Sequence, residues 1–314
     1  LRGSNKAGAP GTPEHWFGHF CAGGDIRFFH DAALAGDDAL EAFFTEEYTL
    51  NHLIQTYPKP IVAFMDGVVM GGGMGLCQGI ARRIVTERTK MAMPETKIGL
   101  FPDVGGGHFL SRCPGHVGEY LALTGQVIGA DAAIVHGLAD VRVDSSQQAA
   151  LWQRLAETRW DHADAAQAWL DGVLPVQAAS GGLNAALESS FSQPSVLQIV
   201  QTLESASDEG SRQTAATLRQ RSPLMLHVAL EQVRRARGMD LADELRMERD
   251  MVWQCFHKRP AGESETVEGI RALAVDKDHA PRWQPARIED VDADEVRGFF
   301  QSPWTEAAHP LRGL

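Results

Sequence analysis

The chain has 314 residues, 44% of them hydrophobic, which is enough to bury one large core or two smaller ones. Its 41 acidic and 29 basic side chains give a formal net charge of -12, which argues against nucleic-acid and anionic-membrane partners because both need a positive field. The four cysteines lie far apart without a C-x-x-C pair, which argues against a metal site or a disulfide framework and favours a cytoplasmic location.

The first predicted element is a surface loop over residues 3–18, where Gly, Pro and Ser supply turns rather than core. Residues 31–55 carry apolar residues at helical spacing, which predicts an amphipathic helix that Pro58 and Pro60 end. The segments KPIVAFMDGVV and ARRIVTERTKMAMPE predict strands, with a turn and a helix at the glycines between them. Asp66 interrupts the first apolar run, so no stretch reaches the roughly 18 residues of a membrane span.

From residue 117 onward the pattern turns helical, most clearly in SPLMLHVALEQVRRARG and DLADELRMERDMVWQCF. The chain therefore opens as α/β and closes mostly as α. We place an α/β core over residues 1–205 and a helical C-terminal region over residues 206–314, although residues 150–222 show no clear boundary.

The stretch VVMGGGMGL places Gly71, Gly72 and Gly73 between a predicted strand and a predicted helix. Glycines there let the backbone approach a ligand and leave N–H groups free at a helix start, which describes half of an oxyanion hole. A tight turn that needs glycine for packing alone explains this stretch equally well. The segment CAGGDIR, residues 21–27, offers a second turn, and two N–H donors are what a thioester oxygen needs as it becomes an oxyanion.

Three stretches in order, FCAGGDIR, KPIVAFMDGVVMGGGMGL and MPETKIGLFPDVGGGHFL, resemble the crotonase (enoyl-CoA hydratase/isomerase) superfamily. FFTEEY, ALTG followed by GLAD, and VEGIRALAVDKDHAPRWQP extend the resemblance over residues 20–290, and it is strongest to the branch that hydrolyses 3-hydroxyisobutyryl-CoA. It implies an α/β fold with a crotonase-like spiral core of repeated ββα units and a helical C-terminal region. It also implies an acyl-CoA substrate and no separate cofactor, since coenzyme A is part of the substrate. Members of the superfamily begin with further residues that form the first strands, so we expect those strands to be absent here.

The resemblance carries over the site residues position by position. It implies that the backbone N–H groups of Gly24 and Gly72 form the oxyanion hole and that Glu95 and Asp103 are the catalytic acids. Glu47 would bind the substrate together with Gly72, Glu95 and Asp103. A buried carboxyl group alone tends to take up a proton, so acids in this apolar setting point to chemistry. Whether Glu95 is the nucleophile or the general base stays open.

The phosphates and adenine of coenzyme A need local contacts despite the net negative charge. The candidates are Ala22, Arg27 and Lys277, although solvated surface charge explains the two cations as well. Glu95 and Glu47 have alternatives of the same kind, an acid at a helix N-terminus that faces solvent and an ordinary solvated helix face. A homo-oligomer is compatible with the sequence.

Two positions separate the activities within the superfamily. Gly75 stands where hydratases carry a second catalytic glutamate, and Asp103 stands where hydrolases have aspartate and hydratases have glycine. The resemblance therefore favours hydrolysis of a short 3-hydroxyacyl-CoA. The alternatives are an enoyl-CoA isomerase with Glu95 as its single acid, a hydratase, and a CoA-binding module without catalysis.

Overall fold

The computed structural model describes residues 1–4, 17–160, 162–177 and 181–314. Most of the predicted surface loop, residues 5–16, lies outside the described residues. Two compact units make up the chain. Unit 1 holds Leu1–Gly23, Leu53–Ala92 and Val127–Gly181, and unit 2 holds Gly24–His52, Met93–Gln126 and Gly182–Leu314. The boundary at residue 205 stays a prediction.

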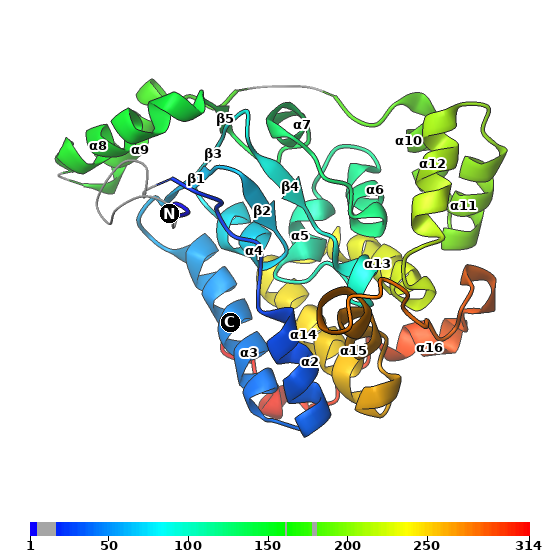
Figure 1. Cartoon of the computed structure of the whole chain (residues 1–314). Coiled ribbons are helices and arrows are strands. Elements are labelled where there is room, and N and C mark those ends of the chain that lie inside the picture. Colours follow the sequence, from blue (N-terminus) through cyan, green and yellow to red (C-terminus); the bar gives the residue numbers. More distant parts are fainter. Residues whose placement is uncertain (5–16, 161, 178–180) are drawn as a thin grey trace. The chain divides into compact units, whose positions relative to one another are not determined.

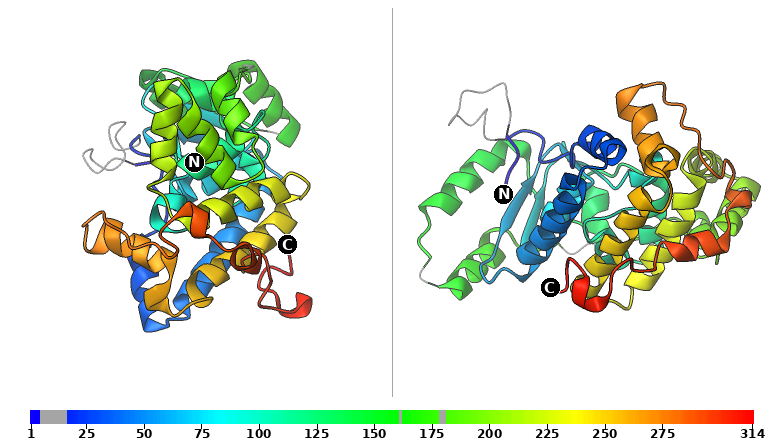
Figure 2. Two further views of the ribbon diagram at one scale, coloured as in Figure 1. Left: turned by 90° about the vertical axis from the view of Figure 1, so that its right-hand side faces the viewer. Right: turned by 90° about the horizontal axis from the view of Figure 1, so that it is seen from below.

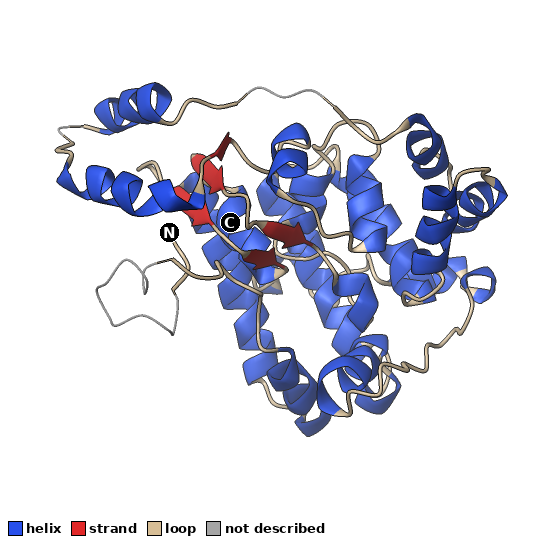
Figure 3. Cartoon of the chain, turned by 45° about the horizontal axis from the view of Figure 1, so that its top comes forward, coloured by secondary structure: helices blue, strands red, loops and turns tan. Residues whose placement is uncertain are grey.

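Unit 1 contains two small parallel sheets, drawn as red arrows in Figure 3 and labelled in Figure 1. One has the order β1 (Val62–Met65), β3 (Arg82–Val85), β5 (Val141–Arg142), and the other pairs β2 (Val68–Met70) with β4 (Lys90–Ala92). Helix α4 (Gly72–Gln78) follows β2. The predicted strands are confirmed, as is the turn that leads into a helix at the glycines.

Residues that pair across neighbouring strands show how the sheets are built. Phe64, Ile84 and Val141 stand in one row of the first sheet, and Cys21 forms a parallel bridge to Val69 in the second. Each turn of the chain therefore adds one segment to each sheet before it moves on. This is the spiral of ββα units that the resemblance implies.

The core of unit 1 lies on the first sheet. Its buried members are Phe64, Ile84, Val141, Leu170 and Leu174. The leucines come from α9 (Ala163–Val173) and its end, and α7 (Ala130–Val135) and α8 (Gln148–Glu157) complete the unit. Strands that are covered on both faces read as continuous apolar runs, which is why the sequence shows them clearly.

The single helix predicted over residues 31–55 is wrong. The structure has α2 (Ile26–Ala35) and α3 (Ala39–Thr56), separated at Gly36. Gly36 has φ 64° and donates its N–H to the carbonyl groups of Ala32 and Ala33, which ends α2. A glycine in this left-handed conformation is a common helix C-terminus. The apolar spacing continues across it because buried apolar residues recur at helical spacing within each of the two helices.

Unit 2 is built mainly from helices, which the views of Figure 2 show from two further sides. Besides α2 and most of α3 they are α5 (Gly106–Leu110), α6 (Val117–Thr124), α10 (Ala185–Phe191), α11 (Val196–Ser205), α12 (Glu209–Leu218), α13 (Pro223–Ala236), α14 (Leu241–His257), α15 (Glu265–Ile270) and α16 (Ala293–Gly298). Short helical turns join them at η1 (Glu95–Ile98), η3 (Ala261–Glu263), η4 (Arg271–Val275), η5 (Ile288–Asp290) and η6 (Glu306–Ala308). Among the described residues, no helix combines the length and the apolar character that crossing a bilayer requires.

A substitution at Gly73 tests how closely two backbone segments of unit 1 approach each other. A Cβ atom on Gly73 would lie 2.4 Å from the carbonyl oxygen of Cys21, so part of the backbone must shift to admit it. We expect Gly73→Ala to lower the free energy of unfolding by about 1–3 kcal/mol, measured by thermal unfolding. Gly172→Ala is the matched control, because open space surrounds that position on α9 and alanine favours a helix by roughly 0.5–1 kcal/mol. Equal stability of the two variants would contradict the close approach.

Candidate active site

Glu95 lies at the start of η1, three residues after β4 ends. Two side-chain hydrogen bonds fix this turn, from Thr96 Oγ1 to the carbonyl of Leu123 at 3.1 Å and from Thr266 Oγ1 to the carbonyl of Gly99 at 2.6 Å. The Glu95 side chain is only 6% exposed, and its Oε2 atom is buried without a hydrogen-bond partner among the described residues. The alternative that Glu95 faces solvent is therefore wrong.

Asp103 lies in the turn before α5 and is also 6% exposed. Its Oδ2 atom accepts a hydrogen bond of 2.9 Å from the hydroxyl of Tyr48, a fully buried residue of α3. Glu47 precedes Tyr48 on the same helix and is partly buried, whereas Glu46 is exposed. Unit 2 thus brings Glu47, Glu95 and Asp103 together, close enough for their charges to interact.

The three carboxyl groups have different proton affinities. Burial, and then the charge of Asp103, raises the pKa of Glu95 well above its ordinary value. Burial and then Asp103 raise the pKa of Glu47 to about 8. Burial raises the pKa of Asp103 to about 6, against the opposing effect of the Tyr48 hydrogen bond. At neutral pH Asp103 is therefore mostly ionised while Glu47 holds its proton, and groups separated in this way can divide acid and base roles.

The two glycines predicted for the oxyanion hole lie in different units. Gly72 begins α4 in unit 1, where a Cβ atom on the neighbouring Gly23 would lie 3.3 Å from the Gly72 nitrogen. Gly24 belongs to unit 2, and a Cβ atom there would lie 2.8 Å from the ring of Phe29. Neighbouring atoms therefore lie close to the backbone at both Gly72 and Gly24. The pairing of their N–H groups stays a prediction.

The residues predicted to bind coenzyme A are all exposed. Arg27 Nε donates to the carbonyl of Ala274 at 3.2 Å, three residues before Lys277, so unit 2 holds the segments of these two cations side by side. Ala22 belongs to unit 1. The coenzyme A contacts of all three residues stay predictions.

Sequence reasoning missed three residues beside the acids, namely Tyr48, Glu244 and Glu248, all of them fully buried. A signal was present in DLADELRMERDMVWQCF, because Glu248 falls on the stripe that Leu245 and Val252 form at helical spacing. An acid on the buried stripe of a helix needs a hydrogen-bonding partner in the core.

No group of three or more His, Cys, Asp or Glu side chains in the described part of the chain is arranged to hold a metal ion. The four cysteines, all of them within the described ranges, form no disulfide bonds. Burial raises the pKa of Cys77 to about 12, so this thiol beside the glycine turn stays protonated.

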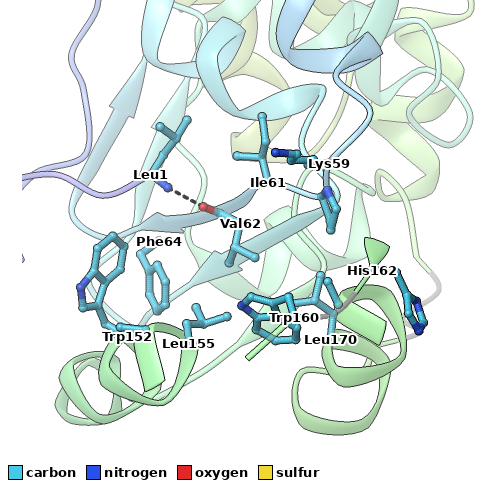
Figure 4. A pocket seen from close by; sticks show the side chains of 13 residues that line it. Leu1, Lys59, Ile61, Val62, Phe64, Trp152, Leu155, Trp160, His162 and Leu170 are labelled. Carbon is cyan, nitrogen blue, oxygen red and sulfur yellow. Dashed lines mark hydrogen bonds between the residues drawn. The ribbon is translucent and has the colours of Figure 1, made fainter. Parts of the chain in front are cut away.

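A separate cavity of about 770 Å³ lies in unit 1 and is mainly apolar (Figure 4). Phe64, Trp152 and Leu170 line it, and at its edge the Leu1 ammonium donates to the carbonyl of Val62 at 2.6 Å. Among the described residues that line it there is no carboxylate and no predicted site residue. This cavity is not the acid site.

Comparison with known proteins gives one family and relatives that agree with it. The family model described as enoyl-CoA hydratase/isomerase matches residues 17–300. The mitochondrial 3-hydroxyisobutyryl-CoA hydrolase of Xenopus tropicalis is 38% identical over 290 residues, which cover 90% of this chain and 74% of that protein. The 3-hydroxyisobutyryl-CoA hydrolase 1 of Arabidopsis thaliana is 37% identical over 292 residues, covering 90% and 76%. The cytoplasmic location stays a prediction.

Two solved structures share the fold along most of the chain. An enoyl-CoA hydratase from Rhodobacter sphaeroides 2.4.1 superimposes with a TM-score of 0.77 at 36% identity, covering 90% of this chain and 81% of that one. A carnitinyl-CoA dehydratase from Mycobacterium thermoresistibile gives a TM-score of 0.75 at 36% identity, covering 90% and 79%. The fold class predicted from the sequence is confirmed. The names of these relatives agree on acyl-CoA chemistry and differ in the reaction.

The raised pKa values make stability depend on pH. Folded Glu47 and Asp103 bind protons more tightly than at their ordinary values of 4.5 and 3.8, so stability is lost as pH rises toward their folded values of about 8 and about 6. We expect Glu47→Gln to gain stability over the wild type as pH rises from 5 to 8.5, measured by chemical denaturation. The exposed neighbour gives the control Glu46→Gln, for which we expect a difference that does not change with pH. A pH-independent effect of Glu47→Gln would contradict the assignment.

Proposed function

The chain belongs to the enoyl-CoA hydratase/isomerase (crotonase) family of acyl-CoA enzymes, and on that basis we propose that it is a thioester hydrolase. Its substrate in this proposal is a short 3-hydroxyacyl-CoA, in the first place 3-hydroxyisobutyryl-CoA. The observation that carries the proposal is the buried pair of Glu95 and Asp103, with Asp103 at the position that distinguishes hydrolases in the resemblance. The names of the relatives from Xenopus and Arabidopsis support the substrate.

Cleavage would begin at the thioester carbonyl carbon. Either the Glu95 carboxylate attacks it and forms an acyl-enzyme anhydride, or a water molecule attacks while Glu95 takes its proton. Both routes use the ionised form of Glu95, and the burial that raises its pKa disfavours that form. The N–H groups of Gly24 and Gly72 would stabilise the oxyanion. Collapse breaks the C–S bond, and the thiolate of coenzyme A takes up a proton. On the first route water then hydrolyses the anhydride, which releases the hydroxy acid and restores Glu95.

Asp103 and Glu47 would act on the acyl group. Asp103, mostly ionised near neutral pH and held by Tyr48, would bind the acyl hydroxyl, orient the water molecule, or take up a proton from that water and transfer it to the leaving thiolate. Glu47 keeps its proton below a pH of about 8, so it can donate a hydrogen bond to the 3-hydroxyl oxygen. A site built to bind a hydroxyl group rejects analogues that lack it, which would favour 3-hydroxyacyl substrates.

The competing activities need other groups. A hydratase uses a second carboxylate, and the corresponding Gly75, buried in α4, has no side chain to supply one. An isomerase needs only Glu95, so Asp103 would be unused. A binding module without catalysis would have no use for acids that burial destabilises.

Release of free thiol from a panel of acyl-CoA thioesters tests the proposal. We expect the wild type to cleave 3-hydroxyisobutyryl-CoA or 3-hydroxypropionyl-CoA, and Glu95→Gln to lower kcat by about 10²–10⁴-fold because the amide can neither attack nor accept a proton. The exposed acid Glu46 again gives the control, since Glu46→Gln should keep wild-type activity. Full thiol release by Glu95→Gln would contradict its role, and turnover of an enoyl-CoA without thiol release would favour the isomerase.

A further inference from the structure

We infer that Gln232 and Glu248 are positioning residues that hold the Asp103 turn in its active geometry. We call this pair the turn clamp. The inference rests on the proposed hydrolysis, in which Asp103 touches the substrate. Gln232 comes from α13 and Glu248 from α14, and both side chains are fully buried in unit 2.

The turn clamp binds the backbone on both sides of Asp103. After it, Glu248 Oε2 accepts the Gly105 N–H at 2.7 Å and Glu248 Oε1 accepts the Gly107 N–H at 3.1 Å. Before it, Gln232 Nε2 donates to the carbonyl of Pro102 at 2.7 Å. The same nitrogen donates to Glu248 Oε1 at 2.9 Å, which joins the two members of the clamp.

The close fit of the clamp explains the glycines of the PDVGGG motif. Gly105 has φ 84°, a conformation that favours glycine. A Cβ atom on Gly107 would lie 2.3 Å from Glu244 Oε1 and 3.1 Å from Gln232 Nε2. The glycines of the motif have no side chains, and this leaves room for the buried side chains of α13 and α14 to contact the backbone.

The turn also holds one unfavourable conformation. Val104, directly after Asp103, has φ 59°, which is strained for a β-branched residue. Such a conformation persists only when its surroundings enforce it. The hydrogen bonds of the clamp on either side of Val104 supply that constraint, and they thereby fix the direction in which the Asp103 carboxylate points to Tyr48.

Burial also explains why the clamp uses these donors. Burial, and then the charge of the neighbouring Glu244, raises the pKa of Glu248 well above its ordinary value. In this setting its two oxygens accept hydrogen bonds from backbone N–H groups and from the Gln232 amide, without a cation.

Steady-state kinetics of the full chain test the inference. Glu248→Gln turns an amide NH₂ toward a backbone N–H, and Gln232→Leu removes the donor to Pro102 at similar volume. We expect both variants to lower kcat by about 10–100-fold with KM changed less than about threefold, because a misplacement near 1 Å can reduce a rate by about 10²-fold. The control is Glu119→Gln, which removes a fully buried carboxylate that pairs with Arg237 at the C-terminal end of α13, outside the Asp103 turn. It should lower the unfolding temperature and keep wild-type kcat.

A second measurement separates this inference from the proposed function. Amide hydrogen exchange over residues 103–107 should be faster in folded Glu248→Gln and Gln232→Leu than in the wild type, and unchanged in Glu119→Gln. Wild-type kcat in the two folded clamp variants would overturn the inference. If the wild type cleaves no thioester, the proposed hydrolysis fails. Amide hydrogen exchange in the two clamp variants then tests the turn clamp by itself. Faster exchange than in the wild type supports the clamp, and unchanged exchange overturns it.

Discussion

The site depends on the hydrogen bond from the buried Tyr48 hydroxyl to the buried Asp103 carboxyl group. Asp66, another buried acid, pairs with Arg88, and that pairing lowers the pKa of the acid. A cation so close would fix the charge of Asp103 permanently. A neutral phenol stabilises the carboxylate more weakly and leaves its pKa near neutrality, where a proton can still be exchanged.

Uncharged hydrogen-bond donors also hold other parts of the site. Glu248 is held by backbone N–H groups and by the amide of Gln232, and Glu95 is placed by a turn whose own hydrogen bonds come from threonine hydroxyls. Positions can thus be fixed without adding positive charge. Uncompensated carboxyl groups lower stability, and their retention in one place is typical of a site selected for activity rather than for folding.

Much of the fold could be predicted from the sequence because it is local. The buried strands are continuous apolar runs, the glycines mark the turns, and Glu95 and Asp103 lie in one motif of sixteen letters, MPETKIGLFPDVGGGH. The break at Gly36 was missed because apolar residues recur at helical spacing both before and after it. Glu248 was missed for another reason: its hydrogen bond to Gly105 joins positions 143 residues apart, and the apolar spacing within a single helix cannot show such a contact.

The ionised Asp103 also has a consequence for what happens after catalysis. Thioester cleavage turns an uncharged acyl group into a free acid, which ionises near neutral pH. In the proposed reaction this new anion would form next to a carboxylate in a setting of low dielectric, where like charges repel strongly. Repulsion between the product carboxylate and the carboxylate of Asp103 would then favour release of the product. The same repulsion would disfavour the reverse reaction, because the free acid would have to bind again beside Asp103.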